Sequence, residues 1–219
     1  MSISALFLLG GVVMWPLLAF SILAIALILE RIIFWQRITK RQKLIIREVL
    51  RLYQQDPAAA FYKLEQNSDL PMTRIFLAAL ELEQPTPEEF RLALESAAQA
   101  ELPILNRFST VFDTVINVSP LLGLLGTILG LMEAFGGLKI GDVGGSKTAA
   151  IAGGISEALI STVGGLCVAI FTLLFANTFR GLYRRQLASI QEYGGKLELI
   201  YRRYYERGKF PYPGVHKPE

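Results

Sequence analysis

The stretch from Gly154 to Arg180 reads GISEALISTVGGLCVAIFTLLFANTFR, and Glu157 is the only charged residue between Thr148 and Phe179. An α-helix rises about 1.5 Å per residue, and the hydrocarbon core of a bilayer is about 30 Å thick. This run is therefore long enough to cross a membrane as one helix.

Two more runs have the same character, since residues 1–29 and 114–132 contain no charged residue. The composition agrees: 52% of the 219 residues are hydrophobic, 19% are charged, and the mean hydropathy is +0.40. These values fit neither a soluble domain nor a disordered chain. The sequence predicts an all-α integral membrane protein with three transmembrane helices, of which the second and third extend into the cytoplasm as long helices.

The first run is expected to remain as an anchor, because its start has no Lys or Arg, no A-x-A site follows, and it ends at Glu30 and Arg31. Basic residues then set the orientation of the chain. They follow the first and third spans: Arg31, Arg37, Lys40, Arg41, Lys43, Arg47, Arg180, Arg184 and Arg185. We therefore expect the N-terminus outside the cell membrane and the C-terminus in the cytoplasm.

The expected segments alternate between membrane and solvent. They are a first transmembrane helix (1–35), a cytoplasmic helical segment (36–112), a second transmembrane helix (113–137), a short outer loop (138–148), a third transmembrane helix (149–179), and a cytoplasmic helix with a Pro-rich tail (180–219).

Helix signals are strong before the second span. Apolar residues from Phe76 to Leu82 predict an amphipathic helix, and Thr86, Pro87 and Glu89 form an N-cap, an N1 proline and a capping-box glutamate. We expect the helix from Pro87 to continue into the second span, with kinks at Pro103 and near Pro120.

The third span is expected to continue beyond Arg180 with helical spacing, weakened at Gly194 and Gly195. No strand pattern, repeat or second domain is apparent in the sequence.

Other classes of function find little support. The basic run from Arg37 to Arg51 follows a span and is soon balanced by acids, which favours membrane topology and anionic lipid head groups over nucleic acid. A lone Cys167 and a lone His216 predict no disulfide, metal site or cofactor. The loop GDVGGSKTAA has Ser146 where a phosphate-binding loop needs glycine, so a turn is favoured over a nucleotide site. No catalytic residues converge, and we expect no enzyme.

Small residues recur on one face of each of the last two spans: Gly123, Gly126 and Gly130 in the second, and Gly154, Ala158, Ser161 and Gly165 in the third. Such faces let helix backbones approach closely in lipid. Packing within one subunit explains them, and a lumen between subunits remains the alternative.

Glu157 favours a watery interior, because a carboxylate in hydrocarbon costs about 2.5 to 3.5 kcal/mol on insertion scales. Thr127, Ser161 and Thr162 carry hydroxyls that can relay hydrogen bonds without charge. We interpret these four residues as a polar line, a candidate proton pathway, inside an apolar bundle. Two alternatives stay open: Glu157 as a helix-end charge at the interface, and Thr162 bonded to its own backbone.

Three stretches resemble the ExbB/TolQ/MotA family of proton-channel proteins, and the ExbB branch most closely. They are MWPLLAFSILAIALILER (14–31), SPLLGLLGTILGLMEAF (119–135) and GISEALISTVGGLCVAI with FANTFR (154–180). The three spans also favour ExbB or TolQ over MotA-type stators, which have four.

The resemblance implies a homopentamer in the bacterial inner membrane around an ExbD-like single-span partner, whose membrane aspartate carries the proton. It implies that proton-motive force energises TonB-dependent transport across the outer membrane through a TonB-like protein. The family's pore threonines correspond to Thr127 and Thr162, and its membrane glutamate to Glu157. Phe171 stands where the family usually has proline. A TolQ-like motor for envelope maintenance and a non-conducting membrane scaffold are the alternative functions.

Overall fold

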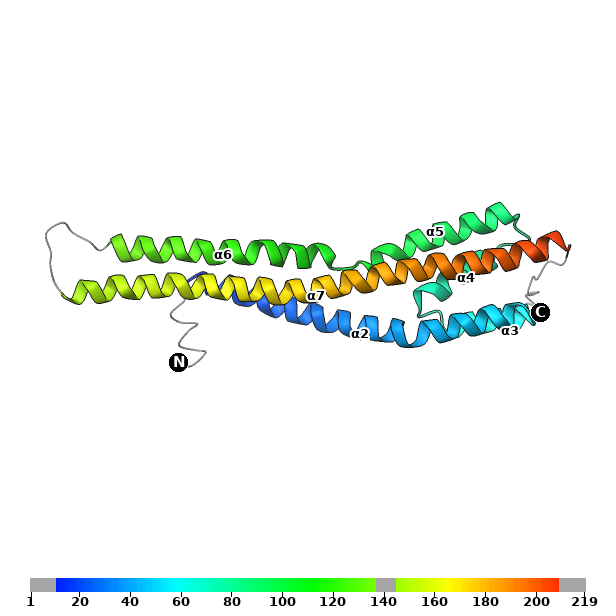
Figure 1. Ribbon diagram of the computed structural model, residues 1–219, viewed down its shortest axis with the longest axis horizontal. Coiled ribbons are helices and arrows are strands. Elements are labelled where there is room, and N and C mark those ends of the chain that lie inside the picture. Colours follow the sequence, from blue (N-terminus) through cyan, green and yellow to red (C-terminus); the bar gives the residue numbers. More distant parts are fainter. Residues whose placement is uncertain (1–10, 137–144, 209–219) are drawn as a thin grey trace, which may run out of the picture. The chain divides into compact units, whose positions relative to one another are not determined.

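The computed structural model describes residues 11–136 and 145–208, and the side chains of 145–152 and of Glu157 lie outside that description. The described residues form helices and short connections, with no strand among them (Figure 1). The helices are α2 (Met14–Tyr53), α3 (Pro57–Glu65), α4 (Pro71–Leu80), α5 (Pro87–Leu105), α6 (Ser109–Gly136) and α7 (Gly145–Glu206). The predicted all-α class is confirmed.

Three of these helical stretches are long and apolar enough to cross a membrane, as predicted: they lie in α2, in the segment that ends with α6, and in α7. Between 22% and 28% of each apolar window is buried inside the protein. Most of this apolar surface therefore faces outward, as expected of helices that meet lipid or other subunits.

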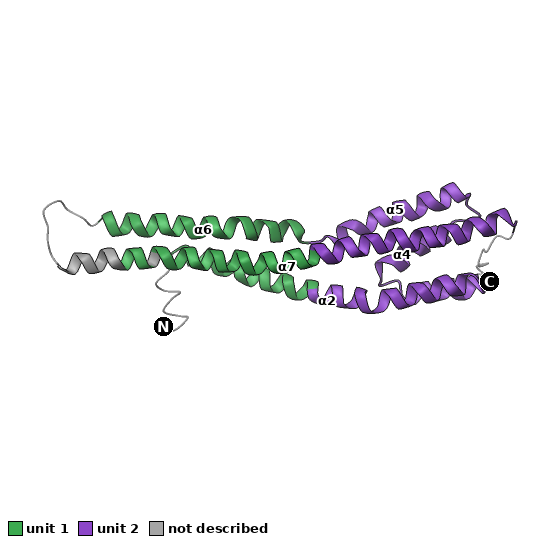
Figure 2. Ribbon diagram, in the orientation of Figure 1, with its two compact units in different colours: residues 1–31, 108–179 green, residues 32–107, 180–219 purple. Residues whose placement is uncertain are grey.

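The chain divides into two compact units (Figure 2). Unit 1 comprises residues 1–31 and 108–179, and unit 2 comprises residues 32–107 and 180–219. Unit 1 holds the apolar part of α2, all of α6 and the first part of α7. Unit 2 holds α3, α4, α5 and the remaining parts of α2 and α7.

Helix α2 is longer than the sequence predicts. We expected only the second and third spans to continue as long helices, but α2 runs for 40 residues, to Tyr53. The reason is a buried stripe at helical spacing that follows the apolar run: Trp35, Ile38, Ile46, Val49 and Tyr53.

The shorter helices of unit 2 begin at residues that favour the start of a helix. Asp56 caps α3 by accepting hydrogen bonds from the backbone N–H groups of Ala58 and Ala59, at 3.0 and 3.1 Å. Helix α4 confirms the predicted amphipathic helix, although it ends at Leu80 and leaves Leu82 outside.

The predicted capping box at the start of α5 is confirmed. Thr86 Oγ1 accepts from the Glu89 N–H at 3.3 Å, and the Glu89 carboxylate accepts from the Thr86 N–H at 2.7 Å. Hydrogen bonds to Thr86 also hold the pKa of Glu89 below its usual value.

The expected continuous helix from Pro87 into the second span is wrong. Helix α5 ends at Leu105, two residues after Pro103, and α6 begins at Ser109. Phe108 lies between them with φ 68°, in the left-handed region that non-glycine residues rarely adopt. Pro103 cannot donate a backbone hydrogen bond, and this weakens the last turn of α5. Helix α6, in contrast, continues through Pro120 without interruption.

Helix α7 confirms that the third span continues past Arg180, since it runs for 62 residues. It includes Gly194 and Gly195, where a Cβ would meet nothing within 4 Å. The helix begins at Gly145, inside the segment expected to be the outer loop. His216 and the Pro-rich tail lie outside the described residues.

Candidate functional site

Helices α6 and α7 of unit 1 approach each other through their glycines. A Cβ on Gly165 would lie 3.1 Å from the Cα of Gly123 and would also meet the carbonyl oxygen of Ser119. A Cβ on Gly123 would lie 3.0 Å from the Cα of Thr162. These neighbours are backbone atoms, so side chains at either position would force the helices apart.

The close approach continues along the same two faces. A Cβ on Gly126 would lie 2.6 Å from the Cβ of Ser161, and one on Gly130 would lie 3.0 Å from the Gly154 carbonyl oxygen. A Cβ on Gly154 would lie 2.7 Å from that of Ala134. Ala158 is buried and lies near Gly130. The six predicted packing residues thus meet in one contact between α6 and α7.

Two threonine hydroxyls meet within this contact. Thr127 Oγ1 on α6 and Thr162 Oγ1 on α7 share a short hydrogen bond in which either can donate. Both hydroxyls also lie within donating distance of the Gly123 carbonyl oxygen, at 3.2 Å for Thr127 and 3.1 Å for Thr162. Thr162 therefore bonds across to the backbone of α6, and no bond to its own helix appears among the described residues.

Ser161 extends the group of hydroxyls. Its Oγ donates to the carbonyl oxygens of Ala158 at 2.8 Å and Gly123 at 3.2 Å, and the residue is fully buried. Thr127 Oγ1 also lies 3.3 Å from the Ala158 carbonyl oxygen. Two backbone carbonyls, one from each helix, thus gather three hydroxyl groups. We call Thr127, Ser161, Thr162 and the Gly123 carbonyl the hydroxyl cluster.

The members of the hydroxyl cluster differ in exposure. Ser161 is enclosed by the two helices, whereas Thr127 and Thr162 are half-buried. The threonine pair therefore remains accessible from outside the helix pair, while Ser161 serves the packing between the helices. Within the threonine pair one hydroxyl donates to the other, whereas the backbone carbonyl oxygens of the cluster only accept.

Glu157 belongs to α7, one residue before Ala158. Its side chain lies outside the described residues, so its place on the polar line stays a prediction.

Ser119 was not predicted as a site residue; it is fully buried, and its Oγ has no hydrogen-bond partner among the described residues. A buried hydroxyl without a partner costs free energy. Its signal in the sequence is its spacing, since Ser119 lies one turn before Gly123 on the same small-residue face.

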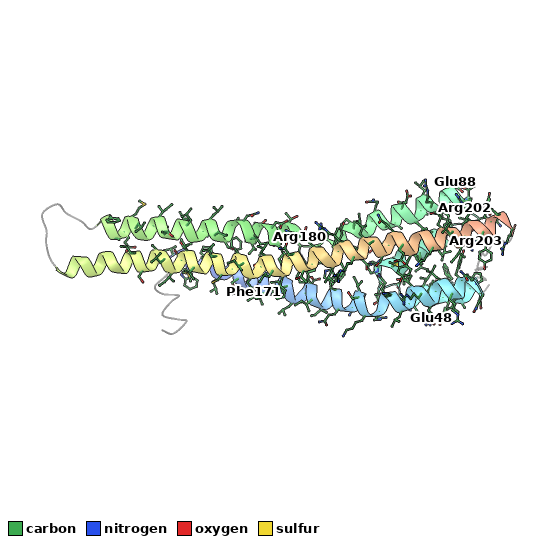
Figure 3. All side chains as sticks on the ribbon, in the orientation of Figure 1. Glu48, Glu88, Phe171, Arg180, Arg202 and Arg203 are labelled. Carbon is green, nitrogen blue, oxygen red and sulfur yellow. The ribbon has the colours of Figure 1, made fainter. Side chains whose placement is uncertain are left out.

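Phe171, at the position where the related family usually has proline, lies in α7 and leaves the helix uninterrupted (Figure 3). It is exposed, and its ring centroid lies 5.0 Å from that of Phe175. In the next position the buried Thr172 donates to the carbonyl oxygen of Val168, at 2.7 Å. A proline-based kink is thus absent from this part of α7.

Within the described part of the chain, no group of three or more His, Cys, Asp or Glu side chains is placed to hold a metal ion. Cys167 is exposed on α7.

Comparisons with known proteins agree on one family. The model of the MotA/TolQ/ExbB proton channel family matches residues 67–192. An ExbB-like biopolymer transport protein of Synechocystis sp. (ExbB-like 3) is 60% identical over 198 residues, covering 90% of this chain and 94% of the relative. ExbB-like 1 of the same organism is 41% identical over 210 residues, covering 95% of this chain and 83% of the relative.

The Tol-Pal system protein TolQ of Haemophilus influenzae is 37% identical over 109 residues, covering 48% of this chain and 44% of the relative. The chain thus resembles both named branches, and ExbB-like proteins over nearly their whole length. With three apolar helices and a match to the family model over more than half its residues, this chain belongs to the MotA/TolQ/ExbB proton channel family.

Proposed function

We propose that this chain is an ExbB-like proton-channel subunit, which works with an ExbD-like single-span partner in the bacterial inner membrane. The proton-motive force then energises TonB-dependent transport across the outer membrane. The observation that carries the proposal is the hydrogen-bonded pair of Thr127 and Thr162 between two apolar helices.

In this proposal the threonine pair lines the proton path. One threonine hydroxyl donates to the other, and the accepting threonine donates to the Gly123 carbonyl oxygen, so both Oγ atoms are held in place. The two side chains are half-buried, so a partner helix that carries an ionisable carboxyl group has access to them. Glu157 is the proposed site that stabilises water or a proton near the outer half of the path.

The outward apolar surface supports an oligomer. Leu121, Ile128 and Met132 on α6, and Leu159 and Leu174 on α7, are all exposed in the single subunit. In a homopentamer some of this surface would meet neighbouring subunits and the rest would meet lipid. The small-residue contact between α6 and α7 would then hold each subunit together, while the threonine pair faces the lumen.

Transport in cells provides the functional test. Thr162→Ala should abolish TonB-dependent uptake in a strain that lacks the native gene. Thr178→Ala is the matched control, because its hydroxyl bonds only within α7, to the Leu174 carbonyl oxygen at 2.9 Å. Both variants should accumulate and assemble as the parent does. Full uptake with Thr162→Ala would contradict the proposed path.

A TolQ-like motor for envelope maintenance is the second candidate, favoured by the match to TolQ of Haemophilus influenzae. Both candidates share the mechanism and differ in partner. Native mass spectrometry of the complex extracted gently from its own membranes would identify the co-purifying chains. A single-span protein with a membrane aspartate supports the motor and names its pathway, whereas an oligomer without one favours a non-conducting scaffold.

A further inference from the structure

Unit 2 contains a cavity between α2 and α7 that the proposed function does not use. Its volume is about 240 Å³. Trp35 and Met72 belong to its apolar wall, and Lys43, Arg47, Arg185 and Gln186 belong to its polar wall. All of these residues lie in unit 2.

The polar wall is cationic. Lys43 and Arg185 form no ion pair with any described residue, and Arg47 Nε donates to the hydroxyl of Tyr193 at 3.4 Å. The acidic residue of the lining, Glu192, is paired with Lys196 one turn along α7. Its charge is therefore already balanced, which leaves three positive charges at the cavity.

The pKa of Glu192 reports the same field. The hydrogen bond and charge of Lys196 lower this pKa most, and Lys43 and Arg47 lower it further. An anion that enters the cavity would meet the same two cations.

Gln186 supplies an independent observation. Its side chain is 7% exposed, and its Nε2 has no hydrogen-bond partner among the described residues. The other buried glutamine of the lining, Gln42, differs, since its Oε1 accepts from the backbone N–H of Met72 at 3.4 Å. A buried donor without an acceptor costs free energy unless a ligand or water supplies one.

We propose that this cavity binds a phosphate-bearing anion, with Lys43 and Arg185 supplying charge and Gln186 Nε2 donating from the buried side. Phosphate offers several acceptor oxygens, and the arginine fork matches them. The anion has two conceivable sources, which share this chemistry: an anionic phospholipid head group and free phosphate. A phospholipid would also place apolar carbons against the wall at Trp35 and Met72, whereas free phosphate would use the polar wall alone.

Trp35 provides the readout, because the chain has two tryptophans and Trp15→Phe leaves Trp35 alone. The full-length protein, delipidated in dodecyl maltoside, is titrated with dihexanoyl phosphatidylglycerol, with inorganic phosphate, and with dihexanoyl phosphatidylcholine as a zwitterionic control. We expect a saturable change in Trp35 fluorescence with at least one of the first two probes. Saturation by phosphatidylglycerol that phosphate does not displace identifies the lipid head group, and saturation by phosphate identifies the free anion.

Neighbouring basic residues provide matched controls. Lys43→Gln and Arg185→Gln should each weaken binding roughly tenfold, as the loss of one charge-assisted contact does. Lys40→Gln and Arg184→Gln remove the same charge from the same helices outside the cavity lining and should change binding less than about twofold. Absence of saturable binding with both anions would overturn the proposal. Equal losses in the cavity and control variants would also overturn it, because they would show diffuse attraction to a basic surface.

Discussion

The hydroxyls of Thr127 and Thr162 are hydrogen-bonded to each other across α6 and α7, and the Gly123 carbonyl oxygen lies within hydrogen-bond distance of both, at 3.2 and 3.1 Å. The bond depends on close helices. A larger residue at Gly123 would separate Thr162 from Thr127, because its Cβ would lie 3.0 Å from the Cα of Thr162. Helix packing and the polar contact are therefore one structural feature.

Gly165→Ala should destabilise the protein, because the added Cβ would meet the backbone of Gly123 and of Ser119. Overpacking of this kind costs about 1–3 kcal/mol, which corresponds to a melting temperature lower by roughly 2–10 °C. Thermal unfolding of the detergent-solubilised protein measures the change. Gly153→Ala, on the same helix with nothing within 4 Å of the added Cβ, should leave the melting temperature nearly unchanged. Equal stability of the two variants would contradict the close approach.

Much of this site is visible in the sequence because its causes are local. Spacings of three and four place Gly123, Gly126 and Thr127 on neighbouring positions of one helical face, whatever the rest of the chain does. The rotation of α6 against α7 is not local. This rotation brings Thr127 to Thr162 and leaves the Ser119 hydroxyl without a partner among the described residues, and the sequence pattern of a single helix does not specify it.

The fold shows the same division between local and nonlocal causes. The capping box at Thr86 depends on residues that are close in the sequence, and its prediction is confirmed. The extension of α2 to Tyr53 was missed, because basic residues between Trp35 and Tyr53 hide the apolar period. The left-handed backbone of Phe108 has no signal, since phenylalanine is a poor choice for that region.

Glu101→Gln should destabilise unit 2. Both carboxylate oxygens of Glu101 accept from the Arg74 guanidinium, at 2.6 and 2.5 Å, and the Glu101 side chain is 10% exposed. The hydrogen bond to Glu101 raises the pKa of Arg74. Arginine stays charged in proteins, so Glu101→Gln would leave the Arg74 guanidinium without this carboxylate. Because Arg74 is partly exposed, we expect a loss of about 1–3 kcal/mol in the free energy of unfolding.

Glu95→Gln is the control for this ion pair. Its contact with Arg91 is 3.8 Å long and both side chains are exposed, so its removal should cost about 0–0.5 kcal/mol. Denaturant titrations of the two variants compare the costs. Similar losses would show that the Arg74–Glu101 pair adds nothing beyond a surface contact.

The capping box predicts a pH dependence. The folded state lowers the pKa of Glu89 below its unfolded value of 4.5, through hydrogen bonds to Thr86. Its contribution to stability is therefore fully present above the unfolded pKa and is lost as the pH falls through the lower, folded pKa. Melting temperatures of the parent and of Glu89→Gln should differ at pH 7 and converge as the pH falls through the lowered pKa of Glu89. A difference for Glu89→Gln that stays constant over this pH range would contradict the coupling.

The proposed topology places unit 2 in the cytoplasm. A cysteine introduced at the exposed Glu83, in a Cys167→Ser background, should react with a membrane-impermeant maleimide only after the inner membrane is permeabilised. The basic residues that follow the apolar runs within α2 and α7 are the physical reason for this orientation. Labelling in cells in which only the outer membrane is permeable would contradict this topology, because unit 2 would then lie on the periplasmic side.

Proton flux into proteoliposomes that contain the complex with its single-span partner tests the central claim most directly. Thr127→Val and Thr162→Val remove each hydroxyl while keeping the side-chain shape, and a pH-sensitive dye reports the rate under an imposed potential. If the two hydroxyls act as one unit, each single variant should slow the flux at least about tenfold and the double variant should be no slower than either. Parental flux in both single variants, with normal assembly, would contradict a proton path along Thr127 and Thr162.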